Sequence, residues 1–282
     1  MGLGGIITAM VTPFDARGRV SEDGTVALVR HLLANGSDGL VVAGTTGEGP
    51  TLSDEEKLRL FELVVAEADG APVIAGTGSN DTAHSVHLTE QATELGVDAV
   101  LVVTPYYNKP NRRGILAHFR AVASATDRPV VVYNIPSRCV VDIPNELLRE
   151  LAEIPNVQAV KQARFDQVEP IEGLDLLAGN DEMLASVLDM GGSGGILVAS
   201  HIVGAEMRRM IDEPESRREI HDSLADLLSV MSITTNPIPI KAAVAMLGVE
   251  VGGLRLPMVE ASEDELFEIR RALERHGLLS AV

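Results

Sequence analysis

The stretch PVVVYNIPSRCVVDIPNELLRELAEIPNVQAVKQA (129–163) contains two short and almost continuous apolar runs, at 129–135 and 157–163. Neither run alternates between polar and apolar residues, which is typical of parallel strands buried on both faces. Similar runs recur along the chain, and the full set is GIITAMV (5–11), GLVVAG (39–44), PVIAGTG (72–78), AVLVVTP (99–105), PVVVYNI (129–135), VQAVKQA (157–163), LDLLAG (174–179) and GGILVAS (194–200). The sequence therefore predicts a parallel sheet of eight strands.

The stretches between these runs have helical spacing and helix start signals. Ser53 and Glu56, for example, stand at the two positions of a capping box just before KLRLFELVVAEA. An open doubly wound sheet would carry a glycine-rich phosphate fingerprint after the first strand, and VTPFD (11–15) has none. Strands alternating with helices in this number instead predict an α/β fold of the closed type, a (β/α)8 TIM barrel.

The alternation stops after Ser200, and the remaining sequence predicts helices only, at roughly 216–233, 237–247 and 262–277. We therefore expect a catalytic barrel over 1–215 and a C-terminal helical region over 216–282. This region would be an all-helical appendix on the barrel.

Composition narrows the classes of partner. The 282 residues include 23 basic and 41 acidic side chains, which gives a net charge of −18. A chain this acidic repels nucleic-acid phosphates and anionic membrane surfaces. We expect neither nucleic acid nor a membrane as a partner.

Cysteine usage and the N-terminal sequence indicate the compartment. The single cysteine, Cys139, excludes an internal disulfide and a cysteine-cluster metal site, and it is typical of a reducing environment. The opening MGLGGIITAMVTPFD lacks the layout of a signal peptide. The sequence thus predicts a cytoplasmic protein.

Metal and cofactor motifs are not found. The seven histidines are scattered, and His84 and His87 have no nearby carboxylate pattern of the kind that binds zinc or iron. The glycines of GGSGG (191–195) fit phosphate binding or simple close packing equally well. We expect no metal and no organic cofactor.

Polar residues gather where the predicted strands end. In barrels of this type the chemistry lies at the C-terminal ends of the strands and in the loops that follow. The residues there are GTTGEG (44–49), Pro105 to Asn108, Tyr133 to Arg138, Lys161, and Gly179 to Asp181. All three tyrosines of the chain belong to this set.

Lys161 is the most informative of these residues, because it interrupts a buried strand in a chain with four lysines and nineteen arginines. A lysine in an apolar interior loses the solvation of its charged form, so its pKa falls and the nucleophilic neutral amine becomes available. Such an amine forms Schiff bases with carbonyl substrates. The alternative is a lysine that extends to solvent or pairs with a carboxylate.

Tyr133 precedes Lys161 by one strand and should end at a similar height. Its phenol can relay a proton to or from an imine on Lys161. It could equally be a packed side chain in the barrel mouth, and the same ambiguity holds for Tyr106 and Tyr107.

Two further groups are candidates for binding carboxylates. Thr45 and Thr46 stand between glycines, where hydroxyls and approachable N–H groups suit a small carboxylate, although a tight turn would look the same. Arg138 could hold a second carboxylate in a bidentate manner, or form a surface salt bridge.

Thr45, Thr46, Tyr107, Tyr133, Arg138 and Lys161 occur in an order that resembles a known family. The segments ITAMVTPFD, GTTGEG, VTPYYNKP, YNIPSR, GNDEML, TNPIPIK and LRLPM add to the resemblance. The chain is similar to the dihydrodipicolinate synthase branch of the pyruvate-dependent class I aldolases, which also include N-acetylneuraminate lyase. The resemblance covers essentially the whole chain.

The resemblance implies an activity and a role for each residue. Pyruvate would condense with L-aspartate-4-semialdehyde to give 4-hydroxy-tetrahydrodipicolinate, in lysine and diaminopimelate biosynthesis, with no cofactor. Lys161 would form the Schiff base, and Tyr133, Thr45 and Tyr107 the proton relay. The remaining expected roles are pyruvate carboxylate binding by Thr45 and Thr46, pocket lining by the backbone of Ile196 and by Gly179, and binding of the semialdehyde carboxylate by Arg138.

The resemblance also implies an assembly. Tyr107 would reach the site of an adjacent subunit in a homotetramer built as a dimer of dimers. Enzymes of this kind often carry a lysine effector pocket, and at the matching positions this chain keeps Asn80 and Tyr106 but has Asp54, Lys57 and His84. A cation at Lys57 and no carboxylate at His84 predict weak or absent inhibition by lysine.

The chain departs from the family pattern at two places. Cys139-Val140 follows Arg138 where Thr-Gly is common, and Gln162-Ala-Arg-Phe-Asp follows Lys161 where Glu-Ala-Thr-Gly-Asp is common. Loss of that glycine should alter the loop that carries Arg138, and with it the aldehyde specificity. A sibling aldolase acting on a sugar acid or another 2-oxo acid, and a pyruvate-binding homologue without turnover, are the alternative functions.

Overall fold

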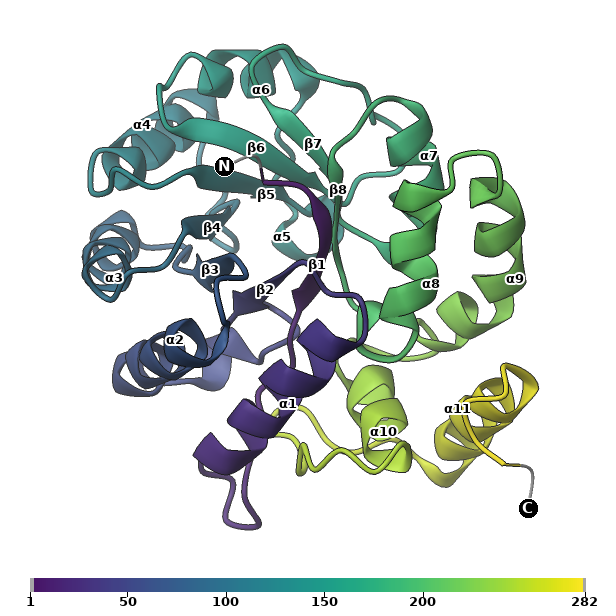
Figure 1. Cartoon of the computed structure of the whole chain (residues 1–282). Coiled ribbons are helices and arrows are strands. Elements are labelled where there is room, and N and C mark those ends of the chain that lie inside the picture. The colour runs from purple at the N-terminus through teal and green to yellow at the C-terminus, as the bar shows by residue number, and fades with distance from the viewer. Residues whose placement is uncertain (1–2, 281–282) are drawn as a thin grey trace.

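Eight parallel strands close into a barrel in chain order in the computed structural model, which describes residues 3–280 (Figure 1). The closure comes from β8, which pairs with β1. The strands are β1 Gly5–Ala9, β2 Gly39–Val42, β3 Val73–Gly76, β4 Ala99–Val103, β5 Val130–Asn134, β6 Val157–Gln162, β7 Asp175–Ala178 and β8 Gly194–Leu197. The predicted barrel is confirmed. Each apolar run extends past the C-terminal end of its strand, so the last residues of each run belong to the catalytic face of the barrel.

Helices surround the strands on the outside, except the short α5 Pro136–Cys139, whose Cys139 packs in the cluster inside the barrel. The outer helices are α1 Glu22–Ala34, α2 Asp54–Glu67, α3 Thr82–Glu94, α4 Arg112–Ala123, α6 Asn145–Ala152, α7 Leu184–Asp189 and α8 Ser200–Asp212, with 3-10 turns at Gly49–Thr51 and Asp181–Met183. The predicted capping box of α2 is present, because Ser53 and Glu56 each bond the other's backbone N–H. The short α5 directly follows β5 and carries Arg138.

Three helices follow the barrel, and each lies within its predicted range. They are α9 Arg217–Val230, α10 Ile238–Met246 and α11 Glu263–Arg275. In Figure 1, α10 lies beside the barrel near α1 and α8, and α11 packs against α10 and α9. The division between a barrel over 1–215 and a helical region over 216–282 falls between α8 and α9 and stays a prediction.

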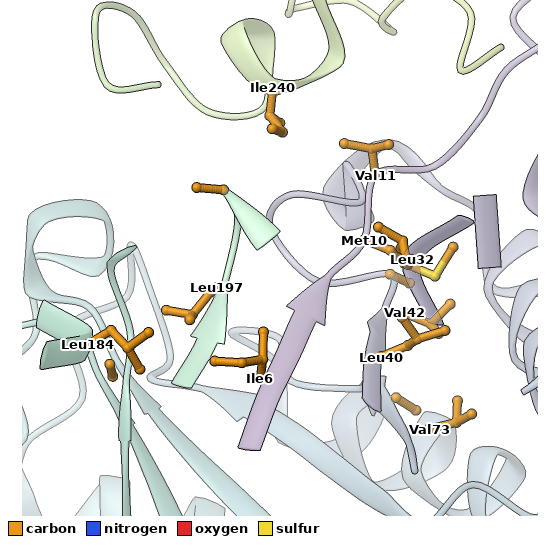
Figure 2. Close-up of a cluster of buried hydrophobic side chains, with 14 of the residues drawn as sticks. Ile6, Met10, Val11, Leu32, Leu40, Val42, Val73, Leu184, Leu197 and Ile240 are labelled. Atoms are coloured by element: carbon orange, nitrogen blue, oxygen red, sulfur yellow. The ribbon is translucent and has the colours of Figure 1, made fainter. Parts of the chain in front are cut away.

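The core has two layers, which explains why the strands show no polar face. In β1, Ile7 joins a cluster inside the barrel, whereas its neighbour Ile6 joins a larger cluster between the strands and the helices. The larger cluster continues into the C-terminal helices. Figure 2 shows Ile240 of α10 pointing toward Val11 just beyond β1. Burial of a side chain such as Ile240 contributes roughly 1.5–3 kcal/mol, so this contact fixes α10 on the barrel.

Within residues 3–280, no helix combines the length and the apolar character that crossing a bilayer requires.

Candidate active site

Lys161 and Tyr133 lie side by side on neighbouring strands. The register between β5 and β6 pairs the two residues directly, and Lys161 Nζ lies 4.3 Å from the centroid of the Tyr133 ring. Each side chain is only 4% exposed. The register of β5 and β6 therefore places the two residues at the same level along the barrel axis, as the sequence predicted.

The surroundings of Lys161 favour a neutral amine. Burial lowers the pKa of Lys161 to about 7, and the charge of Arg138 acts in the same direction, while that of Asp181 raises it. Among the described residues, no carboxylate lies within salt-bridge distance of Lys161. A large share of the amine is therefore unprotonated and nucleophilic near neutral pH.

Tyr133 keeps its proton over the same pH range. Burial raises the pKa of Tyr133 to about 12, and the charge of Arg138 and a hydrogen bond with Thr45 only partly oppose this. A protonated phenol beside the amine can donate a proton to an oxygen that leaves the carbon attached to Lys161.

A small cavity of about 100 Å³ opens at this end of the barrel. Six of the eight residues predicted for the site line it, namely Thr45, Thr46, Tyr133, Arg138, Lys161 and Gly179. A Cβ atom on Gly179 would lie 2.6 Å from the Gln162 carbonyl oxygen, so only glycine lets the two strand ends approach this closely. Ile196 is fully buried inside the barrel, in the same cluster as Tyr133.

Tyr107 is not brought to this cavity. It lies in the loop after β4, has φ of 71° and is 89% exposed. Its neighbour Tyr106 instead lines a larger cavity of about 610 Å³, which shares Thr45, Tyr133 and Arg138 with the smaller one. Within a single chain, Tyr107 therefore has no contact that would let it join the proton relay.

The turn GTTGEG (44–49) is held in place from several sides. Thr46 Oγ1 accepts a hydrogen bond from Asn236 Nδ2 at 3.0 Å, and the Gly47 carbonyl accepts one from Thr12 Oγ1 at 2.6 Å. A Cβ atom on Gly49 would lie 2.3 Å from the Ala43 carbonyl oxygen, so the turn closes only with glycine there. The sequence predicted the turn but not these anchors.

Arg138 is exposed on α5 and donates from Nη2 to the Asn236 carbonyl at 3.2 Å. The residues that follow it, Cys139 and Val140, are the first of the two departures from the family pattern. Val140 has φ of 64°, a left-handed conformation that glycine adopts freely and a β-branched residue only with strain. Val140 therefore keeps a backbone conformation suited to glycine. An effect on the loop and on the aldehyde specificity stays a prediction.

The same loop is tied to the segment after Lys161. Asn134 donates to Asp142 and accepts from the Ile143 N–H, while Asp142 forms an ion pair with Arg164. Asn134 also donates to Gln162 Oε1 at 3.1 Å. Gln162 and Arg164, two of the unusual residues after Lys161, are thus connected through Asn134 and Asp142 to the loop that follows Arg138.

Two cavity residues had no predicted role. Asn236 presents an oxygen, Oδ1, that is buried and accepts no hydrogen bond from the described residues, so it is available to a donor group of a ligand. Asp181 Oδ1 accepts from the Val198 and Ala199 N–H groups at 2.9 and 3.0 Å, and burial raises the pKa of Asp181 to about 6. The motifs TNPIPIK and GNDEML contain both residues, but motif matching alone does not reveal these contacts.

Potential metal ligands are dispersed. Across residues 3–280, no group of three or more His, Cys, Asp or Glu side chains is arranged to hold a metal ion.

Known proteins resemble this chain along nearly its whole length. The profile of the dihydrodipicolinate synthetase family matches residues 2–276. The 4-hydroxy-tetrahydrodipicolinate synthase of Bacillus velezensis is 45% identical over 94% of this chain and 96% of its own, and that of Desulforudis audaxviator is 46% identical over 98% of both. The solved structure of the Cyanidioschyzon merolae enzyme with lysine bound has a TM-score of 0.93 and 40% identity, covering 98% of this chain and 99% of its own. The chain belongs to the dihydrodipicolinate synthetase family.

Proposed function

We propose that this protein condenses pyruvate with L-aspartate-4-semialdehyde to give 4-hydroxy-tetrahydrodipicolinate, in the biosynthesis of lysine and diaminopimelate. The observation that carries the proposal is the buried, unpaired amine of Lys161 beside the Tyr133 phenol. The activity agrees with the name of the curated relatives, which are about 45% identical over nearly their full length.

The first half of the reaction uses the neutral amine. Lys161 Nζ attacks the ketone carbon of pyruvate, and the carbinolamine then loses its oxygen as water to leave a protonated imine. Tyr133 donates the proton that this oxygen needs, and Thr45 connects the phenol to the rest of the relay. Thr45 and Thr46 hold the pyruvate carboxylate, with Gly179 and the backbone of Ile196 as the wall of the pocket.

The second half forms the carbon–carbon bond. The cationic imine withdraws electrons, so the pyruvate methyl group loses a proton and becomes an enamine carbon that attacks the aldehyde. Arg138 binds the carboxylate of the semialdehyde. The amine of the semialdehyde then displaces Lys161 by transimination, which closes the ring and restores the free lysine.

Borohydride trapping tests this function. Pyruvate and sodium borohydride should leave a reduced adduct on Lys161, located by peptide mapping, and the Lys161→Ala variant should carry none. Condensation with the semialdehyde, assayed beside a sugar-acid aldehyde, separates this function from that of a sibling aldolase. An adduct without any condensation would indicate a binding homologue, and no adduct in the folded protein would refute the mechanism.

The assembly belongs to the proposal as well. A homotetramer built as a dimer of dimers would place the exposed Tyr107 in the site of an adjacent subunit, where it would complete the proton relay. Sedimentation of the wild type gives the subunit number. A monomeric variant should still trap pyruvate but lose most of its condensation activity, and full activity in a monomer would refute the role of Tyr107. We also propose a cytoplasmic location, which cell fractionation checks.

The larger cavity supports the expectation of weak inhibition by lysine. Asp54 lies 2.9 Å from His84 Nε2 and 3.5 Å from Lys57 Nζ, so this carboxylate of the cavity is already engaged. An incoming lysine would place an ammonium group near the ammonium of Lys57, and the two like charges repel each other. Half-inhibition at sub-millimolar lysine would contradict this expectation. The His84→Glu variant, which supplies a carboxylate, should be more sensitive than the wild type.

A further inference from the structure

A buried ion pair joins the GTTGEG turn to the C-terminal helical region. Lys241 Nζ of α10 lies 2.7 Å from Glu48 Oε1, and both side chains are 2% exposed. No other ion pair within residues 3–280 has both partners so deeply buried. Each partner makes a further hydrogen bond. Lys241 Nζ also donates to the Gly253 carbonyl at 2.6 Å, and Glu48 Oε2 accepts from the Arg255 N–H at 2.9 Å.

Stability alone is a weak reason for such a pair. Removing two charges from water costs several kcal/mol per ion, and a well-packed apolar pair of similar volume is often as stable. What an ion pair adds is a fixed geometry between the segments that carry its partners. The segments joined here are a turn of the barrel and the helix α10.

Glu48 is well placed to set that geometry. It lies two residues after Thr46, and its φ of 56° is left-handed, so its backbone helps to reverse the chain at this turn. Three groups of the C-terminal region donate hydrogen bonds to the turn. They are the Asn236 amide, which bonds Thr46, and the Lys241 ammonium and Arg255 N–H, which bond Glu48.

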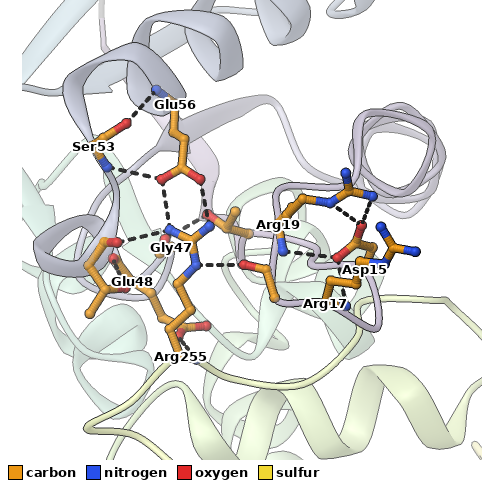
Figure 3. A network of polar contacts seen from close by, with 11 residues as sticks. Asp15, Arg17, Arg19, Gly47, Glu48, Ser53, Glu56 and Arg255 are labelled. Atoms are coloured by element: carbon orange, nitrogen blue, oxygen red, sulfur yellow. Dashed lines mark hydrogen bonds and ion pairs between the residues drawn. The ribbon is translucent and has the colours of Figure 1, made fainter.

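Arg255 also binds residues that follow the turn, as Figure 3 shows for Glu56. Its guanidinium donates to the Thr51 carbonyl at 2.9 Å and to Glu56 Oε2 at 2.7 Å, where Glu56 is the capping-box residue of α2. Lys241 Nζ and Arg255 Cζ also lie 4.3 and 4.5 Å from the centroid of the Phe14 ring, which follows β1. The two cations therefore bind the turn, α2 and the end of β1 together.

We propose that Lys241 and Arg255 are positioning residues for the pyruvate-binding turn. By holding Glu48, they set where Thr45 and Thr46 present their hydroxyl and N–H groups, so the C-terminal region controls the affinity of the barrel for pyruvate. The inference rests on the proposed function, because it assigns the pyruvate carboxylate to Thr45 and Thr46. It adds that residues without contact to the substrate determine this affinity.

The test measures how borohydride trapping on Lys161 depends on pyruvate concentration. Lys241→Met removes the ammonium and keeps much of the side-chain volume. We expect the half-saturating pyruvate concentration to rise at least tenfold, while trapping at saturating pyruvate stays within about threefold of the wild type. Such a separation of affinity from maximal rate is not expected from a general loss of stability.

Arg217→Met is the matched control. Arg217 is also a cation of the C-terminal region that binds a carboxylate outside it, because it lies 2.7 Å from Asp189 at the end of α7. Arg217 and Asp189 do not line the site cavity. The half-saturating concentration of this variant should equal that of the wild type.

Three results would overturn the inference. The first is a half-saturating concentration in Lys241→Met that stays within twofold of the wild type. The second is an equal rise in Arg217→Met. If Lys241→Met does not fold, the Glu48→Gln variant replaces it, since the amide oxygen of glutamine can still accept a hydrogen bond from Lys241. An approximately threefold rise in the half-saturating concentration of Glu48→Gln supports the inference. No rise is the third result that refutes it. Absence of an adduct in the wild type would instead refute the proposed function.

Discussion

Two lysines of this protein are buried to nearly the same degree and have opposite chemistry. Lys161 is 4% exposed at the end of β6, and Lys241 is 2% exposed in α10. Burial lowers the pKa of both. Lys241, however, bonds directly to Glu48, which raises its pKa again, whereas no carboxylate pairs with Lys161 among the described residues.

The comparison teaches that burial alone does not define a reactive lysine. What matters is burial without a paired charge, because only then is the neutral amine the favoured form. The carboxylate whose charge raises the pKa of Lys161 is Asp181. Its Oδ1 already accepts hydrogen bonds from two backbone N–H groups. The barrel therefore leaves Lys161 without a paired carboxylate, whereas Lys241 is paired with Glu48.

The largest effect should come from replacing the unpaired lysine. Lys161→Met is expected to lower kcat/KM by roughly 10⁴-fold or more, because no other residue can form the imine. Steady-state kinetics with both substrates measures the loss. If Lys161→Met kept substantial activity, or if an adduct formed on Lys241, the contrast between the two lysines would be wrong.

Tyr133→Phe should have the next largest effect. Removing the phenol proton donor is expected to lower kcat by about 10²–10⁴-fold. The adduct on Lys161 should still form, although slowly, because the amine remains. Tyr106→Phe is the control, since Tyr106 lines only the larger cavity and should change kcat little. Equal losses in the two variants would argue against a specific relay through Tyr133.

The stabilities of the two methionine variants should change in opposite directions. Lys161→Met removes a buried amine without a paired charge and should raise Tm, whereas Lys241→Met leaves the buried carboxylate of Glu48 without its cationic partner and should cost about 3–5 kcal/mol. Thermal and denaturant unfolding of both variants at pH 7 measure these changes. A lower Tm for Lys161→Met would contradict the comparison.

The gain for Lys161→Met should also depend on pH. The pKa of Lys161 falls from 10.5 to about 7 on folding, so between these values the unfolded chain binds more protons and the wild type becomes more stable as pH rises. The advantage of the variant should therefore be full below pH 7 and disappear toward pH 10.5.

The smallest expected change is a shift in the pH profile of trapping. With the pKa of Lys161 at about 7, the trapping rate at low pyruvate should rise through this pH. Asp181→Asn removes a charge that raises this pKa, while its amide oxygen can still accept from Val198 and Ala199. The inflection should move to lower pH. An inflection that stays or rises would mean that Asp181 does not act on the amine.

The sequence was sufficient to predict the barrel and the pairing of Tyr133 with Lys161, because both follow from local patterns. Apolar runs mark the strands, and the register of adjacent parallel strands places the two side chains together. The strand ends were less predictable, since apolar residues such as Val11 and Ile135 continue a run after the strand has ended.

Contacts between distant segments were not predictable. Glu48 and Lys241 are 193 positions apart, and Asn236 and Thr46 are 190 apart. No periodicity or spacing rule relates such positions, although each residue stood in a recognised motif. Lys161 could be identified because the strand around it is apolar, whereas the structural role of Lys241 becomes visible only when the C-terminal region is folded onto the barrel.

The grip of the C-terminal region on the GTTGEG turn has a consequence for the protein during synthesis. All eight strands, including β6 with Lys161, have been synthesised once Leu197 is added. Asn236, Lys241 and Arg255 emerge from the ribosome only later. The residues that hold the substrate-capturing turn are therefore made after the reactive amine, so under the proposed role of Lys241 and Arg255 full affinity for pyruvate depends on the last part of the chain.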